Sequence, residues 1–180
     1  MAVNSKNLIQ GPAAIYYGAF GATEPTTLTE APGTGWTDLG GTKEGLTISF
    51  ETEWSALTVD QVLDEVGATK TGRTVSAATS LAEATLENLA RAINNPAPTG
   101  GVLEIASNID AFQPVYGAVL VDGVAPGGKR RRIIIRKTLS TENVEMAYKK
   151  DDQTVIPVTF KSYYVSASIS PIKVIDDITV

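Results

Sequence analysis

The chain has 180 residues, with 15 Lys and Arg against 20 Asp and Glu, which gives a formal net charge of −5. It contains no Cys and no His, so disulfides, thiol nucleophiles and His-dependent catalytic sites are excluded. Apolar residues make up 43% of the sequence and charged residues 19%, a balance that favours a folded protein over a disordered one. We therefore expect one domain, residues 1–180, that is not an enzyme.

The first ten residues lack the pattern of a signal peptide, and no run of about 18 apolar residues could cross a bilayer. The absence of Cys fits an oxidising or a reducing compartment equally. We expect no targeting segment, no membrane anchor and synthesis in a cytoplasm.

Alternating apolar and polar residues predict strands in the first third of the chain. Residues 13–20 and 36–39 form the first two, separated by a loop rich in Gly, Pro and Thr at 21–35. The clearest alternation spans residues 45–54 and predicts a half-buried antiparallel strand. Its apolar face carries Leu46, Ile48, Phe50 and Trp54.

The alternation slips after Trp54, which indicates a β-bulge or a segment that leaves the sheet. Residues 55–72 are interpreted as a long extended loop or hairpin arm, with an ordinary bulged strand pair as the alternative. Loops of this length are usually functional or disordered, and the apolar side chains here argue against disorder. These side chains need a partner to bury them.

A single helix is predicted at about residues 80–94. Ser80 and Glu83 have the spacing of a capping box, and Asn94-Asn95-Pro96 ends the segment. Its apolar stripe indicates packing against a sheet face. The stripe consists of Ala82, Leu86, Leu89, Ala90 and Ile93.

The second half of the sequence is dominated by strands and turns. The strand at 114–121 is apolar on both faces, which predicts a central, doubly buried position. Pro157 favours an edge position for the strand at 155–165, and Asp122-Gly123 and Gly127-Gly128 bracket a turn region before the strand at 129–139. Further strands are predicted at 101–107, 129–139 and 143–149. We expect a mainly β fold, a β-sandwich or barrel with one flanking helix.

Basic residues are concentrated between Lys129 and Lys137, where six of the ten in residues 101–180 are found. Such a cluster fits phosphate binding, a solvated face, or contact with the acidic surface of a neighbouring subunit. The chain is acidic and the cluster lacks interleaved aromatic residues, so we favour the subunit contact. The arginines concerned are Arg130, Arg131 and Arg132.

Without Cys and His, catalysis would have to come from carboxylates, Lys, Tyr or hydroxyl groups, and the acidic residues are the candidates with a suggestive spacing. Glu83 and Glu87 stand one helical turn apart, as paired acid–base carboxylates do, but helix-surface charges have the same spacing. The pairs Asp151-Asp152 and Asp176-Asp177 fit turns better than a Ca²⁺ site, which needs roughly 6–8 converging oxygens. With no glycine-rich phosphate loop either, we expect no catalytic residue, metal or cofactor.

The succession of segments resembles the major tail (tail tube) proteins of long-tailed, non-contractile bacteriophages. The resemblance covers most of the chain, although each motif alone is unspecific. It rests on residues 13–25, 36–40, 45–50, Val59-Asp60-Gln61, 81–89, 132–135 and 156–160.

The resemblance implies a tube-forming β-sandwich with one helix packed outside. It implies hexameric rings whose inner strands join around a lumen, and rings that stack into a tube through which double-stranded DNA passes without specific binding. The expected partners are the tape-measure protein, the tail terminator and distal tail or baseplate proteins. The expected location is the virion tail, after synthesis in the host cytoplasm.

In such proteins the long loop and the chain ends contact neighbouring rings. On this chain the role falls to the 55–72 segment, and the arginines are expected at a subunit contact. The contact residues are then Leu57, Val59, Asp60, Val62, Leu63, Asp64, Glu65, Val66, Arg130, Arg131 and Arg132.

Three alternatives stay open at this point. The tube subunit of a contractile tail, or of a related injection or secretion apparatus, shares the expected fold. A monomeric β-sandwich binding module would stay monomeric and bind a definable ligand. A hydrolase based on a hydroxyl or a carboxylate would lose its activity on a single substitution.

Overall fold

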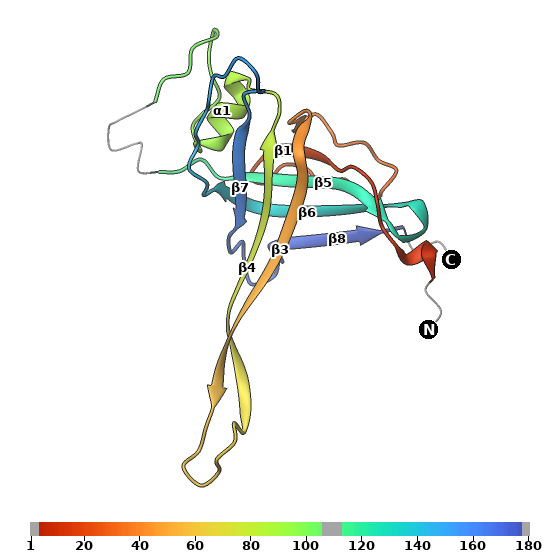
Figure 1. The fold of residues 1–180 in the computed structure, drawn as a ribbon, viewed down its shortest axis with the longest axis vertical. Coiled ribbons are helices and arrows are strands. Elements are labelled where there is room, and N and C mark those ends of the chain that lie inside the picture. The colour runs from red at the N-terminus through yellow and green to blue at the C-terminus, as the bar shows by residue number, and fades with distance from the viewer. Residues whose placement is uncertain (1–3, 106–112, 178–180) are drawn as a thin grey trace.

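Two crossed groups of strands build the fold (Figure 1). The computed structural model describes residues 4–105 and 113–177. They form one antiparallel sheet of order β2-β1-β5-β6-β7-β4-β3, and β8 pairs with β6. The elements in chain order are η1 (Ser5–Asn7), β1 (Ala14–Ala19), β2 (Trp36–Asp38), β3 (Thr42–Leu57), β4 (Gly67–Leu81), α1 (Leu86–Ala92), β5 (Gly117–Ala125), η3 (Pro126–Gly128), β6 (Lys129–Ser140), β7 (Ile156–Ser162) and β8 (Ile172–Asp176).

Strand β6 joins the two groups. Its residues 131–135 pair with β8, whereas its residues 138–140 pair with β7. In Figure 1, β5, β6 and β8 run across the view, and β3, β4 and β7 run nearly along its long axis. The fold is therefore mainly β and sandwich-like, as the sequence predicts.

The main core lies between the two groups. Ile15 of β1, Val119 of β5 and Phe160 of β7 are fully buried in it, and the ring of Tyr17 lies 5.8 Å from that of Phe160. A smaller cluster covers the opposite face of β1, β5 and β6, so β5 is buried on both faces, which confirms the prediction. This second cluster contains Trp36, Ala118, Leu120 and Ile134.

The structure corrects one prediction about strand order and part of one about a turn. Strand β7 lies between β4 and β6 rather than at an edge. Pro157 is tolerated because it is the second residue of β7, where the missing N–H interrupts little of the ladder. The predicted turn region is confirmed at Gly127-Gly128, but Asp122-Gly123 lies inside β5 and the chain turns only at Pro126–Gly128.

Two predicted strands do not form. Residues 143–149 are irregular, because Val144 and Met146 pack against the core without a neighbouring strand to pair with. Of the predicted strand at 101–107, residues 101–105 are irregular and residues 106 and 107 lie outside the described part. Strand β8, which the sequence analysis does not predict, pairs with β6 instead.

Helix α1 is shorter than predicted and has a different cap. Thr85 is the N-cap, and its hydroxyl accepts a hydrogen bond from the backbone N–H of Asn88 at 3.2 Å. The predicted capping box is wrong because Ser80 belongs to the β4–β7 ladder, opposite Pro157. The helix packs against β7, as expected, but its buried residues are Asn88, Ala90 and Ala92, and Leu86 of the predicted stripe is 39% exposed. No helix in residues 4–105 and 113–177 is long and apolar enough to cross a bilayer.

Candidate assembly surfaces

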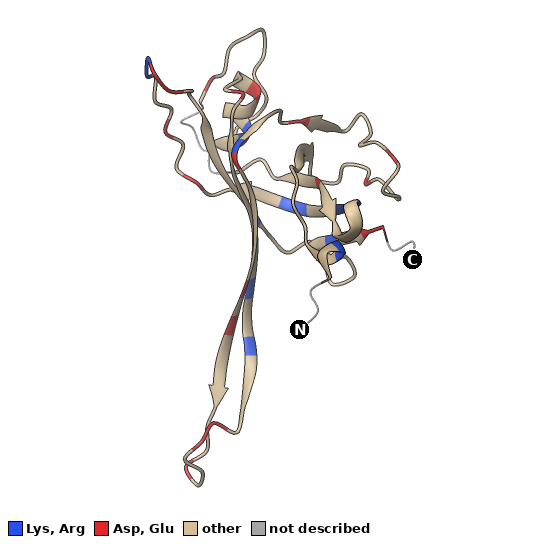
Figure 2. Ribbon diagram, turned by 45° about the vertical axis from the view of Figure 1, so that its right-hand side comes forward, with Lys and Arg blue, Asp and Glu red and all other residues tan. Residues whose placement is uncertain are grey.

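The β3–β4 hairpin extends well beyond the body of the subunit (Figures 1 and 2). Its two strands pair as far as Leu57 and Gly67, so the predicted 55–72 segment is a two-stranded arm with a loop only at 58–66. The register shifts where Glu53 pairs with Gly72 and Trp54 with Lys70, so the arm contains a bulge, but its extra residue is Thr71 of β4 rather than a residue after Trp54. At about 3.4 Å per residue, the strand from Phe50 to Leu57 spans about 24 Å.

The apolar face of this hairpin is covered only at its base. Leu46 and Ile48 pack against the core, as the prediction of a half-buried strand requires. Phe50 and Trp54, further along the same strand, are 60% and 64% exposed. The ammonium group of Lys70 lies 5.9 Å from the centre of the Trp54 ring and covers it in part. The prediction of a half-buried strand therefore fails beyond Ile48, where the body ends.

The loop at 58–66 gathers exposed apolar and acidic side chains at the end of the arm, and we call it the tip loop. Leu63 is fully exposed. Asp60, Asp64 and Glu65 surround it with negative charge, and the loop contains no basic residue. Figure 2 shows this acidic end of the arm far from the body. Such a surface has the character of an interaction site. The other exposed apolar residues beside it are Leu57, Val59, Val62 and Val66.

The sheet also ends in a long edge strand. Among the described residues, β3 pairs with β4 alone, so the outer edge of this 16-residue strand has no neighbour. At the other end of the sheet order, β2 has only three residues. Long unpaired edges are rare in isolated subunits because they pair readily with other strands.

Arg132 lies inside the subunit rather than on its surface. Its guanidinium group is fully buried and donates to both carboxylate oxygens of Asp122, at 2.9 and 2.7 Å. It also donates to the backbone carbonyls of Thr27 and Glu30, at 2.8 and 2.9 Å. These bonds fix the 21–35 loop on the sheet. The expectation that Arg132 lies at a subunit contact is therefore replaced by a role within the chain.

The neighbouring basic residues also have partners within the subunit. The Arg131 guanidinium group donates two hydrogen bonds to the Asp176 carboxylate, at 2.7 and 2.6 Å. These bonds lower the pKa of Asp176. Arg130 lies 2.9 Å from Asp122, but its side chain is 54% exposed. Of the three arginines, Arg130 and the partly exposed Arg131 stay in the proposed contact set. Sequence reasoning missed these pairs because their acidic partners are distant in the sequence or were read as turn residues.

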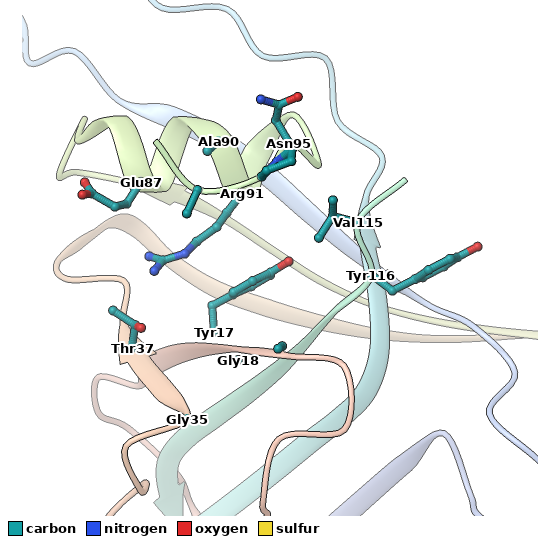
Figure 3. Close-up of a pocket in the computed structure, with 13 residues that line it drawn as sticks. Tyr17, Gly18, Gly35, Thr37, Glu87, Ala90, Arg91, Asn95, Val115 and Tyr116 are labelled. Atoms are coloured by element: carbon teal, nitrogen blue, oxygen red, sulfur yellow. The ribbon is translucent and has the colours of Figure 1, made fainter. Parts of the chain in front are cut away.

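A cavity of about 250 Å³ lies between β1, helix α1 and the segment before β5 (Figure 3). Arg91 projects from the helix over the Tyr17 ring, 5.5 Å from its centre, and donates to the Asn88 side-chain carbonyl at 3.1 Å. Burial raises the pKa of Tyr17 and lowers the pKa of Arg91. Glu87 lines the cavity beside this pair.

The predicted carboxylate pairs have separate structural surroundings. The Glu83 carboxylate accepts a hydrogen bond from the backbone N–H of Gly41 at 3.1 Å, whereas Glu87 lines the cavity beside Arg91. Asp152 pairs with Lys43 at 2.7 Å, and Asp176 ends strand β8 rather than occupying a turn. Among residues 4–105 and 113–177, no three acidic side chains converge in a way that could hold a metal ion.

Comparison with protein families gives a match over nearly the whole chain. A family model described as phage tail tube protein matches residues 1–177. The matched range includes the arm, the helix and the arginine-rich strand β6. No curated protein matches the chain.

Replacing Arg132 should lower the stability of the folded subunit rather than weaken its contacts with other subunits. Arg132→Ala leaves the nearly buried Asp122 carboxylate with less compensation, so we expect the free energy of unfolding to fall by about 3–5 kcal/mol. Arg130→Ala, the matched control on the exposed partner of Asp122, should change it by at most about 1 kcal/mol. Urea unfolding of both variants measures the difference. Equal effects would contradict the role of Arg132.

Glu24 should contribute to stability only above acidic pH. Its hydrogen bond with Arg136 lowers the pKa of Glu24 below its ordinary value of 4.5, so the contribution is present above that value. It is lost as the pH falls through the lower pKa of the folded state. Glu24→Gln should therefore lower the free energy of unfolding by about 1–2 kcal/mol at neutral pH. At a pH low enough to protonate Glu24 in the folded state, the variant and the wild type should be equally stable. A difference that persists at the lower pH would contradict this account.

Proposed function

Because the chain belongs to the phage tail tube protein family, whose model matches residues 1–177, we propose that it forms the tail tube of a long-tailed, non-contractile phage. Six subunits form a ring, and the rings stack into a tube that conducts genomic DNA during ejection. The tape-measure protein fills the lumen before ejection. The tube ends meet the tail terminator and the distal tail or baseplate proteins. The chain acts as a structural subunit without catalytic activity.

The observation that carries this proposal is the uncovered arm. Beyond its base the hairpin lacks a body to pack on, and an isolated two-stranded ribbon is only marginally stable in water. Burying the exposed side chains of Phe50, Trp54 and Leu63 would stabilise the arm by roughly 25 cal/mol per Å² of apolar surface. Stacked rings supply such a cover at every arm.

The edges of the sheet support closure into a ring. A ring of identical subunits brings the β3 edge of one subunit to a surface of the next, and every unpaired edge is then covered. Six-fold closure is part of the proposal and rests on the family resemblance.

The outer face of β3, β4 and β7 is proposed as the lumen wall. Its side chains are mostly small or hydroxyl groups, and its charges are of both signs. Glu51 and Glu53 lie towards the arm, Lys161 lies opposite Ser76, Glu142 accepts a hydrogen bond from Thr159, and Lys43 pairs with Asp152. A wall without a guanidinium cluster, on which carboxylates accompany the lysines, binds phosphates weakly, so DNA can slide. The uncharged residues are Thr47, Ser49, Ser76, Ala78, Ser80 and Thr159.

Removing the arm should abolish stacking and leave the body folded. We suggest replacing residues 54–71 with Asn-Gly, because Glu53 and Gly72 are paired and can flank a two-residue hairpin turn. The variant should keep the circular dichroism spectrum and the urea midpoint of the wild-type monomer. Negative-stain microscopy should show no tubes, since the surface that joins the rings is gone.

Two outcomes would contradict parts of the proposal. Tubes of normal length from the armless variant would remove the arm from ring stacking. A wild-type protein that stays monomeric at every concentration, alone or with tail extracts, would contradict the tube itself.

A further inference from the structure

We propose that the tip loop of one subunit inserts Leu63 into an apolar pocket on the body of a second copy of the chain. The inference rests on the proposed function and goes beyond it by naming the receiving surface. The pocket has a volume of about 220 Å³. Its apolar lining is formed by Phe20, Ala22, Trp36, Ile134, Val165 and Ile169.

The pocket extends the smaller apolar cluster to the surface. Trp36 and Ile134 belong to that cluster and form the buried part of the lining. Phe20 and Ile169 stand at the rim, 49% and 46% exposed. The subunit therefore presents a preformed apolar hollow with a partly exposed apolar rim, which an inserted side chain would cover.

The surroundings of the pocket carry a surplus of positive charge. Arg136 and Lys173 both contact the carboxylate of Glu24, which lines the pocket. The ammonium group of Lys137 lies 5.5 Å from the centre of the Phe20 ring and 4.3 Å from that of Tyr116. The cations near the pocket, Arg136, Lys137 and Lys173, therefore outnumber the carboxylate of Glu24.

The tip loop complements this surface in shape and charge. Leu63 is fully exposed, and Asp60, Asp64 and Glu65 give the loop three negative charges. The pocket volume of about 220 Å³ is several times the roughly 30 Å³ that one water molecule occupies, so the four-carbon side chain of Leu63 fits inside it. An apolar contact surrounded by opposite charges favours one orientation of docking.

The occupant must come from another subunit. The arm points away from its own body in both views (Figures 1 and 2), so Leu63 cannot reach the pocket of its own chain. The cavity beside helix α1 fits the tip loop less well (Figure 3). Its Arg91 already lies over Tyr17, and Glu87 lines it with a charge of the same sign as the tip loop.

Cysteine cross-linking tests the contact cleanly because the native chain has no Cys. Leu63→Cys protein is mixed with Ile169→Cys protein, assembled and oxidised, and the disulfide-linked dimer is quantified on a non-reducing gel. A disulfide requires Cβ atoms about 3.5–4.5 Å apart. We expect at least roughly tenfold more dimer than with the control pair Leu63→Cys and Tyr148→Cys, whose second site is also exposed.

A charge exchange gives a second readout. Asp64→Lys and Lys137→Glu should each raise the protein concentration needed for assembly by roughly tenfold. The double variant restores opposite charges across the contact and should assemble within about threefold of the wild type. Thermal unfolding of each monomer shows whether the variants are folded.

The outcomes separate this inference from the proposed function. Tubes in the microscope with no more cross-linking than the control pair would overturn the pocket as receptor and leave the tube in place. Additive losses in the double charge variant would overturn it too. Absence of rings and tubes from the wild type would contradict the proposed function instead, and the cross-linked dimer would still report whether the pocket receives Leu63.

Discussion

The β3–β4 hairpin is longer than the body that covers it, and this mismatch dominates the structure. The core formed by β1, β5 and β7 covers the apolar face of β3 at Leu46 and Ile48, and further along Phe50 and Trp54 stay exposed. The two strands of the arm stay paired as far as Leu57 and Gly67, but pairing alone gives a two-stranded ribbon only marginal stability. In the proposed tube, the arm gains most of its stabilising contacts from another subunit that packs on it.

Arginines of the body form ion pairs within the subunit, whereas the acidic residues of the tip loop have no basic residue beside them in the loop. The arginines of β6 form bonds with Asp122, Asp176 and Glu24, so much of the basic cluster is used to hold loops and strands of the same chain. The tip loop keeps its acidic residues without a basic residue among them. In the proposed contact, the surplus cations on the body of one copy attract the acidic tip loop of the next copy.

Period-2 patterns predicted most of the sheet because strand burial follows that period directly. Strand patterns located β1, β2 and β5, the last from a run that is apolar on both faces, and the slip after Trp54 indicated a bulge whose extra residue lies in β4. The helix start was misplaced because Ser80, a good cap by type, is already used in the β4–β7 ladder. β8 was missed because it is short and half-exposed, so little alternation marks it. The buried role of Arg132 depends on contacts with the 21–35 loop, which no local pattern encodes.

The environment of Trp54 tests the central claim most directly. The chain has two Trp residues, and the difference between the emission of the wild type and that of Trp54→Phe isolates the signal of Trp54, because Trp36 keeps its buried place in the body of both proteins. Fluorescence and acrylamide quenching are compared between monomer and assembled protein. The account predicts a blue-shifted emission and strong protection from acrylamide on assembly. Assembled tubes in which Trp54 is quenched as readily as in the monomer would contradict it.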